Sequence, residues 1–202
     1  MSREFVFDTS REARIGLAEA LYCAAKQPAQ IDAAVAELAG RGARMLLTRL
    51  DPALHARLAP ATRERLDYHP LSRTAYLGMP EPPRGPARVA VVTAGTSDLA
   101  VAAEAERTLA FAGIACTGRA DIGVAGVWRL LERREQLAAH PVVIAVAGME
   151  GAFFSVLGGL VGSVVIAVPT STGYGVTAGG KAALASALGS CAPGILAVNI
   201  AH

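Results

Sequence analysis

The sequence lacks a strong charge of either sign, since its 202 residues include 19 basic and 17 acidic side chains and carry a formal net charge of +2. So balanced a charge does not predict a nucleic-acid partner. Although 52% of the chain is hydrophobic, it has no run of about 18 apolar residues free of turn signals. We therefore expect no membrane span, and the apolar excess favours a buried parallel sheet or an oligomer that hides apolar surface in subunit contacts.

Cysteine is also scarce. Cys23, Cys116 and Cys191 are odd in number and widely spaced, which argues against a disulfide framework and for a reducing compartment. No Cys-x-x-Cys or His-Glu-x-x-His pattern occurs, so a dedicated zinc site is not expected. The first four residues open no apolar signal-peptide core, and we expect a cytoplasmic protein.

The clearest boundary is a segment rich in proline and glycine at residues 78–87. Its first nine residues hold four prolines and two glycines, which can continue neither a helix nor a central strand, so the segment predicts a semi-rigid linker. Residues 1–77 before it predict a small mixed α/β domain. The expected elements of that domain are helices over 11–25, 30–39 and 52–58, and strands over 43–50 and within 66–77.

Residues 88–202 alternate short β-branched runs with helical segments, which predicts a parallel sheet with right-handed crossovers. The expected strands cover 89–92, 142–147, 164–168 and 195–198, with a weaker candidate at 114–116, and the expected helices cover 99–112, 126–137, 153–160 and 181–188. Ligands of such sheets bind beyond the carboxyl ends of the strands. The loops at those ends are therefore the first place to look for a site.

The loop at residues 93–98 follows the first strand of this sheet. Gly95 lets the backbone approach a ligand, while Thr96, Ser97 and Asp98 can cap the next helix and leave its free N–H groups facing an anion. The segment fits a phosphate site and an ordinary capped turn equally well. Asp98 can also be a catalytic or ribose-binding carboxylate.

Two further loops follow strands. In residues 147–152, Glu150 lies between two glycines and can serve as an acid, a base or a metal ligand, or only favour a helix dipole. Residues 168–180 are too many and too rich in glycine for a simple connection. Their hydroxyls and unhindered amides favour a ligand-binding loop.

Cys191 lies in a different kind of segment, because residues 190–194 precede the last expected strand. A thiolate there can add to an electron-poor carbon. A free cysteine is more often a small buried hydrophobe, and the pattern alone favours that interpretation for all three cysteines.

Several long segments resemble the LarB proteins of nickel-pincer cofactor biosynthesis. They are TAGTSD (93–98), DIGVAG (121–126), AGMEGAFFSVLGGL (147–160), VPTSTGYG (168–175) and SCAPGILAVNI (190–200), with LDYHPLSRTAYL (66–77) similar to the family's segment before the linker. The second half is more distantly similar to PurE. The resemblance implies a PurE-like, flavodoxin- or Rossmann-like three-layer domain over residues 88–202.

The resemblance also implies a reaction. LarB proteins carboxylate the pyridinium ring of nicotinic acid adenine dinucleotide at C5, with CO2 or bicarbonate as co-substrate. They also hydrolyse the phosphoanhydride, which yields pyridinium-3,5-biscarboxylic acid mononucleotide and AMP. By resemblance, Cys191 is the nucleophile that converts the ring to an enamine, and Glu150 or Asp98 handles the ring proton.

Other requirements follow from the same resemblance. Mg²⁺ can assist the hydrolysis by offsetting phosphate charge, although neither a metal requirement nor metal ligands are implied. No tightly bound organic cofactor is expected. PurE-like cores generally assemble as octamers, so we expect a homo-oligomer.

A larger set of residues is implied to bind the substrate or its phosphates. It comprises Thr93, Gly95, Thr96, Ser97, Asp121, Gly148, Met149, Gly151, Pro169, Thr170, Ser171, Gly173, Tyr174, Gly175, Gly179, Gly180 and Asn199, with Asp8, Arg11, Arg14, Glu19 and Lys26 as candidates in the first domain.

The sequence departs from these families in two places. Met149 and Glu150 occupy the region of PurE's catalytic histidine, and the glycine-rich segment that follows Val-Asn-Ile in LarB proteins is absent after Ile200. Two alternatives therefore stay open. One is a related carboxylase, decarboxylase or mutase that acts on another nucleotide or specialised metabolite, and the other is a non-catalytic regulatory protein on the same scaffold.

Overall fold

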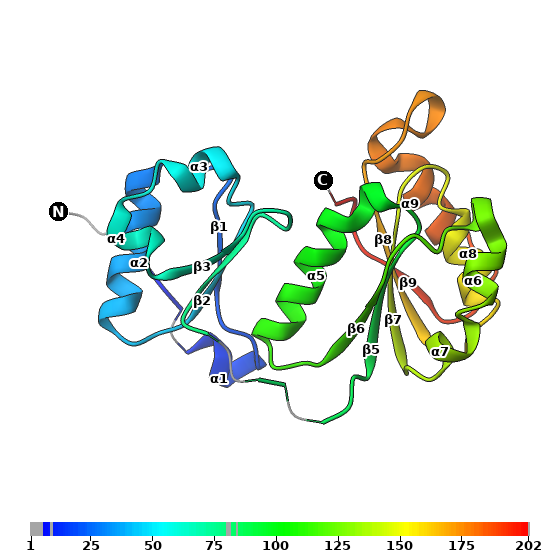
Figure 1. The fold of residues 1–202 in the computed structure, drawn as a ribbon, viewed down its shortest axis with the longest axis horizontal. Helices are drawn as coiled ribbons and strands as arrows, with labels where there is room; N and C mark the ends of the chain where they lie inside the picture. The colour runs from blue at the N-terminus through cyan, green and yellow to red at the C-terminus, as the bar shows by residue number, and fades with distance from the viewer. Residues whose placement is uncertain (1–5, 9, 80–81, 84, 202) are drawn as a thin grey trace. The chain divides into compact units, whose positions relative to one another are not determined.

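The computed structural model of the chain describes residues 6–8, 10–79, 82–83 and 85–201 (Figure 1). It divides into two compact units, one formed by Met1–Pro83 with Arg107–Gly113 and the other by Arg84–Glu106 with Ile114–His202. Residues 80, 81 and 84 of the predicted linker lie outside the described residues. Both units are α/β, as the sequence predicts.

The first unit is built on a four-stranded mixed sheet in the order β1-β2-β4-β3. Strand β1 (Ala20–Tyr22) pairs parallel with β2 (Met45–Thr48), while β4 (Thr74–Leu77) pairs antiparallel with both β2 and β3 (Leu66–His69). Helix α2 (Pro28–Gly40) begins at a proline, which has no N–H to leave unsatisfied there. Its buried side chains Ile31, Val35 and Leu38 pack in one core with Leu47 and Leu77.

One expectation for this unit is corrected. The helix predicted over 11–25 ends early: α1 covers Arg11–Ile15, and Gly16 adopts a left-handed conformation (φ +74°) that stops it. Residues Ala20–Tyr22 form β1 instead, because their backbone groups pair with β2. The segment 66–77 supplies both β3 and β4, and the short helices α3 (Pro52–Ala56) and α4 (Pro60–Arg63) precede it.

The second unit is built on a five-stranded parallel sheet in the order β6-β5-β7-β8-β9. The strands are β5 (Val89–Thr93), β6 (Cys116–Arg119), β7 (Val142–Ala147), β8 (Val164–Pro169) and β9 (Ile195–Ala197). Numbered along the chain, this is the flavodoxin-like order 2-1-3-4-5. The predicted parallel α/β fold is confirmed.

Helices cover this sheet on both sides. Helices α6 (Val127–Leu131), α7 (Arg134–Ala138), α8 (Ala152–Gly158) and α9 (Lys181–Leu188) contribute to one core with the strands. Helix α5 (Leu99–Phe111) begins on the other face (Figure 1). The helix predicted over 126–137 is thus two short helices, and the weak strand candidate at 114–116 is shifted toward β6.

The direction in which successive strands are added to the sheet reverses at β5, which lies between β6 and β7. Successive crossovers run from β5 outward to β6 on one side and from β7 to β9 on the other. Such a switch point leaves a crevice beyond the carboxyl ends of the two central strands. In the described part of the chain, no helix is both long and apolar enough to cross a membrane.

Candidate functional site

A cavity of about 210 Å³ lies at this switch point. Its lining comes from the loops after β5, β6 and β7, at residues 94–95, 97–98, 123–125 and 147–153, together with Arg129 and Thr172, while the predicted residue Thr96 is not part of it. We call it the switch-point cavity. Three of the loops marked out by the sequence therefore contribute to one place, as the carboxyl-end rule predicts.

Asp98 is the most enclosed charged group of the switch-point cavity, with only 3% of its surface exposed. Its Oδ1 accepts a hydrogen bond from the Thr170 hydroxyl at 2.7 Å, and its Oδ2 accepts one from the Gly95 N–H at 3.2 Å. Burial raises the pKa of this carboxyl above its ordinary value, and these hydrogen bonds act in the opposite direction. A carboxylate with a raised pKa is a stronger base than an exposed one.

The backbone is packed tightly around Gly148. A Cβ at this position would lie 2.2 Å from the Thr172 carbonyl oxygen and 2.7 Å from the Thr170 hydroxyl. The next residue, Met149, has a left-handed backbone (φ +52°), and its N–H donates to the same Thr172 carbonyl at 2.7 Å. Strain of this kind in a non-glycine residue concentrates at functional sites. Glu150 follows as an exposed carboxylate on the cavity lining.

Arg129 lines the cavity but was not predicted from the sequence. Its Nη1 donates to Asp121 Oδ2 at 2.5 Å, and the Asp121 N–H donates to the Thr93 hydroxyl at 3.1 Å. Thr93 and Asp121 were both predicted to bind substrate. Neither lines the cavity; Asp121 instead holds the Arg129 side chain, and Thr93 holds the backbone of Asp121 in the loop after β6. The available signal was Asp121 eight residues before an arginine within the short helix α6.

The loop after β8 contributes to the cavity through Thr172. Thr170 is buried, and the Thr177 hydroxyl donates to the Tyr174 carbonyl at 2.8 Å and contacts Met149 Sδ at 3.7 Å. Tyr174 itself is 76% exposed. The other predicted residues of this region do not line the cavity; they are Pro169, Ser171, Gly173, Gly175, Gly179, Gly180 and Asn199.

Cys191 is not part of the switch-point cavity lining. It is exposed, in the loop between α9 and β9, at the amino end of a strand whose neighbours carry the cavity at their carboxyl ends. Ser190 beside it accepts a hydrogen bond from the Ser155 hydroxyl at 2.8 Å, which places this loop against the middle of α8. One copy of the chain does not bring the thiol together with Asp98.

Metal ligands do not converge in the described residues, where no group of three or more His, Cys, Asp and Glu side chains is placed to hold an ion. The carboxylates that line the switch-point cavity are Asp98 and Glu150. Mg²⁺ in nucleotide sites is often held by one or two carboxylates together with substrate phosphates. These residues do not fit a resident metal.

Comparison with known proteins addresses the first part of the chain most directly. Residues 4–79 match the family described as LarB/PurE-like N-terminal domain. Residues 4–79 are therefore a LarB/PurE-like N-terminal domain. An uncharacterized protein of Methanocaldococcus jannaschii is 44% identical over 115 residues, a stretch that covers 56% of this chain and 44% of that protein. The match therefore spans less than half of the length of this relative.

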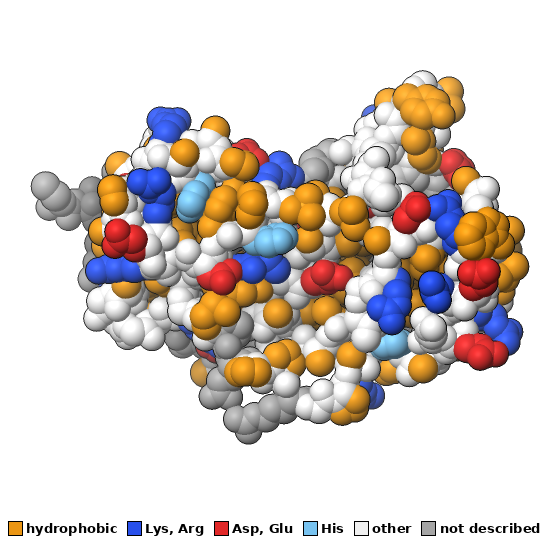
Figure 2. Space-filling view, in the orientation of Figure 1, with side chains coloured by type: hydrophobic (Ala, Val, Ile, Leu, Met, Phe, Trp, Pro, Cys, Tyr) orange, Lys and Arg blue, Asp and Glu red, His pale blue; other side chains and the backbone are white. Residues whose placement is uncertain are grey.

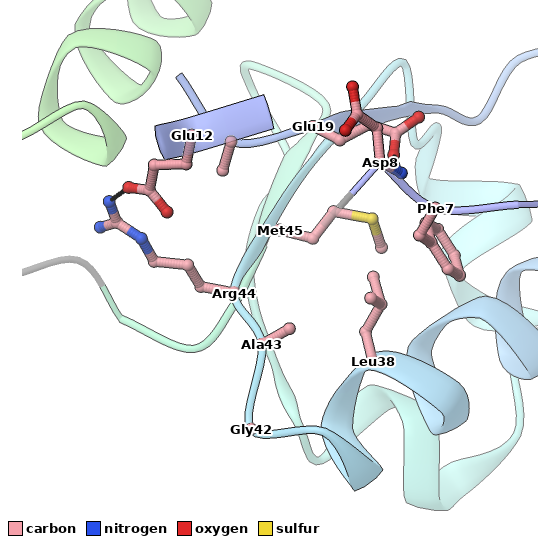
Figure 3. Close-up of a pocket in the computed structure, with 10 residues that line it drawn as sticks. Phe7, Asp8, Glu12, Glu19, Leu38, Gly42, Ala43, Arg44 and Met45 are labelled. Carbon is pink, nitrogen blue, oxygen red and sulfur yellow. Dashed lines mark hydrogen bonds and ion pairs between the residues drawn. The ribbon is translucent and has the colours of Figure 1, made fainter. Parts of the chain in front are cut away.

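The LarB-type N-terminal domain contains a pocket of its own, of about 340 Å³ (Figure 3). We call it the N-terminal pocket. Its lining includes apolar side chains from Phe7, Leu38 and Met45, and charged groups from Asp8, Glu12, Glu19 and Arg44.

The charged groups of the N-terminal pocket are already engaged with one another. Glu12 pairs with Arg44, and Asp8 pairs with Arg14 at 2.6 Å. Glu19 accepts a hydrogen bond from the Asp8 N–H at 2.9 Å. The Arg14 guanidinium lowers the pKa of Asp8 to about 2.

The N-terminal candidates are thus brought together only in part. Asp8 and Glu19 line the N-terminal pocket and Arg14 supports it. Arg11 is exposed on α1, and Lys26 lies in the turn after β1 with its N–H donating to the Cys23 carbonyl.

Proposed function

We propose that this chain is a LarB-type carboxylase that adds CO2 to the pyridinium ring of nicotinic acid adenine dinucleotide at C5 and hydrolyses the phosphoanhydride. The observation that supports the proposal best is the buried Asp98 carboxylate in a cavity at the switch point, under the glycine-rich loops that resemble LarB. The family match over residues 4–79 supports it independently.

The chemistry assigns separate tasks to a thiolate and a carboxylate. A pyridinium ring is an electrophile and does not attack CO2. Addition of the Cys191 thiolate to the ring gives a dihydropyridine, whose enamine carbon then forms a bond to CO2. Asp98 accepts the proton from that carbon, and expulsion of the thiolate restores the pyridinium. Hydrolysis of the anhydride by water then separates AMP from the carboxylated mononucleotide.

The size of the cavity bears on how the substrate would lie. Ligand pockets commonly have volumes of roughly 300–1,000 Å³, whereas this one has about 210 Å³. We propose that it takes the pyridinium ring and its substituents, while the phosphates and the adenosine extend along residues 170–180. Any Mg²⁺ would arrive with those phosphates, since the lining forms no cage for it.

The position of Cys191 makes a homo-oligomer part of the proposal. The thiol lies outside the cavity of its own chain, so a second copy would have to supply it. Figure 2 shows apolar side chains over α6, where Val127, Trp128 and Leu131 are exposed. Clustered exposed apolar surface of this kind marks sites of protein association.

Turnover of nicotinic acid adenine dinucleotide with ¹³C-bicarbonate, followed by mass spectrometry, tests the reaction. Cys191→Ala and Asp98→Asn should each lower the rate at least about 100-fold, the usual range for a lost nucleophile or base. Cys116→Ala is the matched control, because its half-buried thiol lies on β6 outside the cavity. Normal carboxylation by Cys191→Ala would rule out the mechanism.

Mixing the two inactive variants tests the shared site. If a cavity takes its thiol from another copy, mixed oligomers of Cys191→Ala and Asp98→Asn contain some cavities with both groups intact, and activity returns. Mixed oligomers that stay inactive would contradict the sharing. A panel of other nucleotides in the same assay separates the proposed substrate from the alternatives, and a wild-type protein that converts none of them would favour a regulatory role.

A further inference from the structure

The buried Asp98 carboxylate takes one of its hydrogen bonds from a distant part of the chain. The Thr170 hydroxyl, 72 residues further along in the loop after β8, donates to Asp98 Oδ1 at 2.7 Å. Thr170 is 2% exposed and Asp98 is 3% exposed. The resemblance to LarB implies that Thr170 binds substrate, but its hydroxyl is already bonded within the protein and the residue does not line the switch-point cavity.

The backbone of Thr170 is held from three directions. Its N–H donates to the Ala147 carbonyl at 2.9 Å, and the residue forms a parallel bridge with Ala201. On a third side its carbonyl oxygen packs against Gly180, where a Cβ would lie 2.5 Å from it. The direction of the Thr170 hydroxyl therefore follows from the end of the sheet and is set before any ligand arrives.

The Thr170 hydroxyl is enclosed as closely as the backbone. A Cβ at Gly148 would lie 2.7 Å from this oxygen, so the loop after β7 packs against it. The oxygen thus lies between Gly148 and the carboxylate of Asp98. For a buried hydroxyl in this position, a task within the protein fits better than contact with a phosphate.

The bond distinguishes the two oxygens of the Asp98 carboxylate. Oδ1 is bonded to Thr170, whereas the partner of Oδ2 is the Gly95 N–H at a longer 3.2 Å. Gly95 lines the cavity and Thr170 does not, which puts Oδ2 on the cavity side. Oδ2 has the weaker of these two hydrogen bonds and is the oxygen better able to take a proton.

We infer that Thr170 is a positioning residue of the proposed reaction, whose hydroxyl holds Asp98 Oδ1 so that Oδ2 faces the ring carbon that gives up its proton. A base that is already oriented spares the reaction the cost of ordering it. Burial is the main cause of the raised pKa of Asp98, and hydrogen bonds from Thr170, Gly95 and Thr172 act against it by favouring the charged form. The inference rests on the proposed function for the identity of the base.

The charged groups around Asp98 stay in place when Thr170 is changed. Glu150 in the loop after β7 and Arg129 on α6 are the other charged side chains of the described lining. Residues 170–180, which include Thr170, contain no charged side chain. A change in the titration of Asp98 in a Thr170 variant therefore reports the loss of the hydroxyl.

A titration of Asp98 tests the inference without turnover. ¹³C NMR of protein labelled at its aspartates follows the carboxyl, whose signal is assigned by its loss in Asp98→Asn. Thr170→Val keeps the shape of the side chain and removes the hydroxyl, so Asp98 should bind its proton at least about 10-fold more tightly, as for a lost hydrogen bond to a charged group. Thr170→Ser restores the hydroxyl and should return the titration toward that of the wild type. Thr170→Ala gives the same test as valine should the valine variant fail to fold.

Thr117→Val is the matched control. Thr117 lies on β6, outside the cavity lining, and its hydroxyl is hydrogen-bonded to His140 Nε2 at 3.0 Å. The change removes a threonine hydroxyl from the same sheet, and the titration of Asp98 should stay as in the wild type. An equal shift in Thr117→Val and Thr170→Val would assign the effect to a general loosening of the unit and overturn the inference.

Kinetics of carboxylation give the second readout. Thr170→Val should lower kcat at least about 10-fold, because the base is no longer oriented. The acidic limb of its pH profile should move to higher pH, because Asp98 holds its proton more tightly. The KM for the dinucleotide should change by less than about 2-fold, since the residue does not line the cavity. A raised KM with an unchanged acidic limb would make Thr170 a substrate-binding residue and overturn the inference.

Failure of the inference can be told from failure of the proposed function. If the titration of Asp98 depends on Thr170 and serine restores it, but the wild-type protein forms no carboxylated product, the carboxylase is contradicted and the positioning of Asp98 stands. If Thr170→Val carboxylates with the kcat and pH profile of the wild type, the inference is overturned and the carboxylase stands. An Asp98 signal that titrates alike in the wild type, Thr170→Val and Thr170→Ser would overturn the inference whatever the protein catalyses.

Discussion

The N-terminal pocket and the switch-point cavity differ in what their charged groups are bonded to. In the N-terminal pocket each lining charge is engaged: Glu12 with Arg44, Asp8 with Arg14, and Glu19 with a backbone N–H. In the switch-point cavity the Asp98 carboxyl is buried with a raised pKa, and Arg129 keeps an N–H without a partner among the described residues. The N-terminal pocket is larger, at about 340 Å³ against 210 Å³.

This difference shows why size is a poor guide to function. Ion pairs between neighbouring side chains satisfy the groups that a ligand would otherwise satisfy, and at a partly exposed surface they add little stability. Donors and acceptors held in unfavourable surroundings by a rigid backbone are more informative, because the protein tolerates their cost only when something offsets it. On that criterion we propose the smaller cavity as the functional site.

The largest effect is expected from filling the space at Gly148. In Gly148→Ala the new methyl group would meet the Thr172 carbonyl oxygen at 2.2 Å, so the loop after β8 must move. Overpacking of this kind costs about 3 kcal/mol of unfolding free energy, and the moved loop should also lose dinucleotide binding. Urea unfolding followed by the fluorescence of Trp128, the single tryptophan, reports on this unit.

Gly162→Ala is the control for that measurement. A Cβ at Gly162 would meet nothing within 4 Å, so the change should alter the unfolding free energy by no more than about 0.5 kcal/mol. If Gly148→Ala were as stable as Gly162→Ala and bound dinucleotide normally, the switch-point cavity would not be the tightly built site described above.

A smaller effect concerns the pH dependence of stability that Asp98 contributes. Because its pKa is raised in the folded protein from an ordinary value of 3.8, the folded state holds the proton more tightly than the unfolded chain. The stability that this provides is fully present below the unfolded pKa and is lost as pH rises through the folded pKa. Relative to Asp98→Asn, the wild-type protein should therefore lose stability as pH rises from about 4 toward neutrality.

Unfolding free energies of both proteins across that range check the prediction. The value at the lowest pH serves as the baseline, since the protonated carboxyl and the amide are both neutral there. If the two curves of unfolding free energy against pH were parallel, Asp98 would not have the raised pKa that distinguishes this cavity from the N-terminal pocket. If the wild-type protein instead gained stability relative to Asp98→Asn over this range, the pKa of Asp98 would be lowered by folding rather than raised.

The sheet of the second unit was largely predictable from the sequence. Short runs rich in β-branched residues are typical of buried parallel strands, and the runs at 142–147 and 164–168 match β7 and β8 closely. The helix expected over 11–25 failed for a physical reason: Gly16 ends it, and the pairing of β1 with β2, a contact distant in sequence, decides the rest. Apolar spacing within a segment carries no information about such a partner.

The site was predictable as a place more than as a set of side chains. Residues 93–98 and 147–152 follow strands, and they meet at the switch point as expected. Cys191 precedes a strand, so the same rule already places it toward the other end of the sheet, where the structure has it. Arg129 could not be found in this way, because an arginine in a short helix is ordinary until its neighbours and its unpartnered Nε are known.

The smallest effect is expected in the N-terminal pocket. Glu12→Gln breaks the pair with Arg44, whose side chains are 44% and 35% exposed, so solvent screening should limit the loss of stability to about 1 kcal/mol or less. Glu37→Gln breaks the similarly exposed pair between Glu37 of α2 and Arg41, the residue just after that helix, and is the matched control. Neither change should alter the affinity for nicotinic acid adenine dinucleotide in isothermal titration. A 10-fold loss of affinity in Glu12→Gln alone would make the N-terminal pocket part of the ligand site, because a screened surface pair cannot account for an effect of that size.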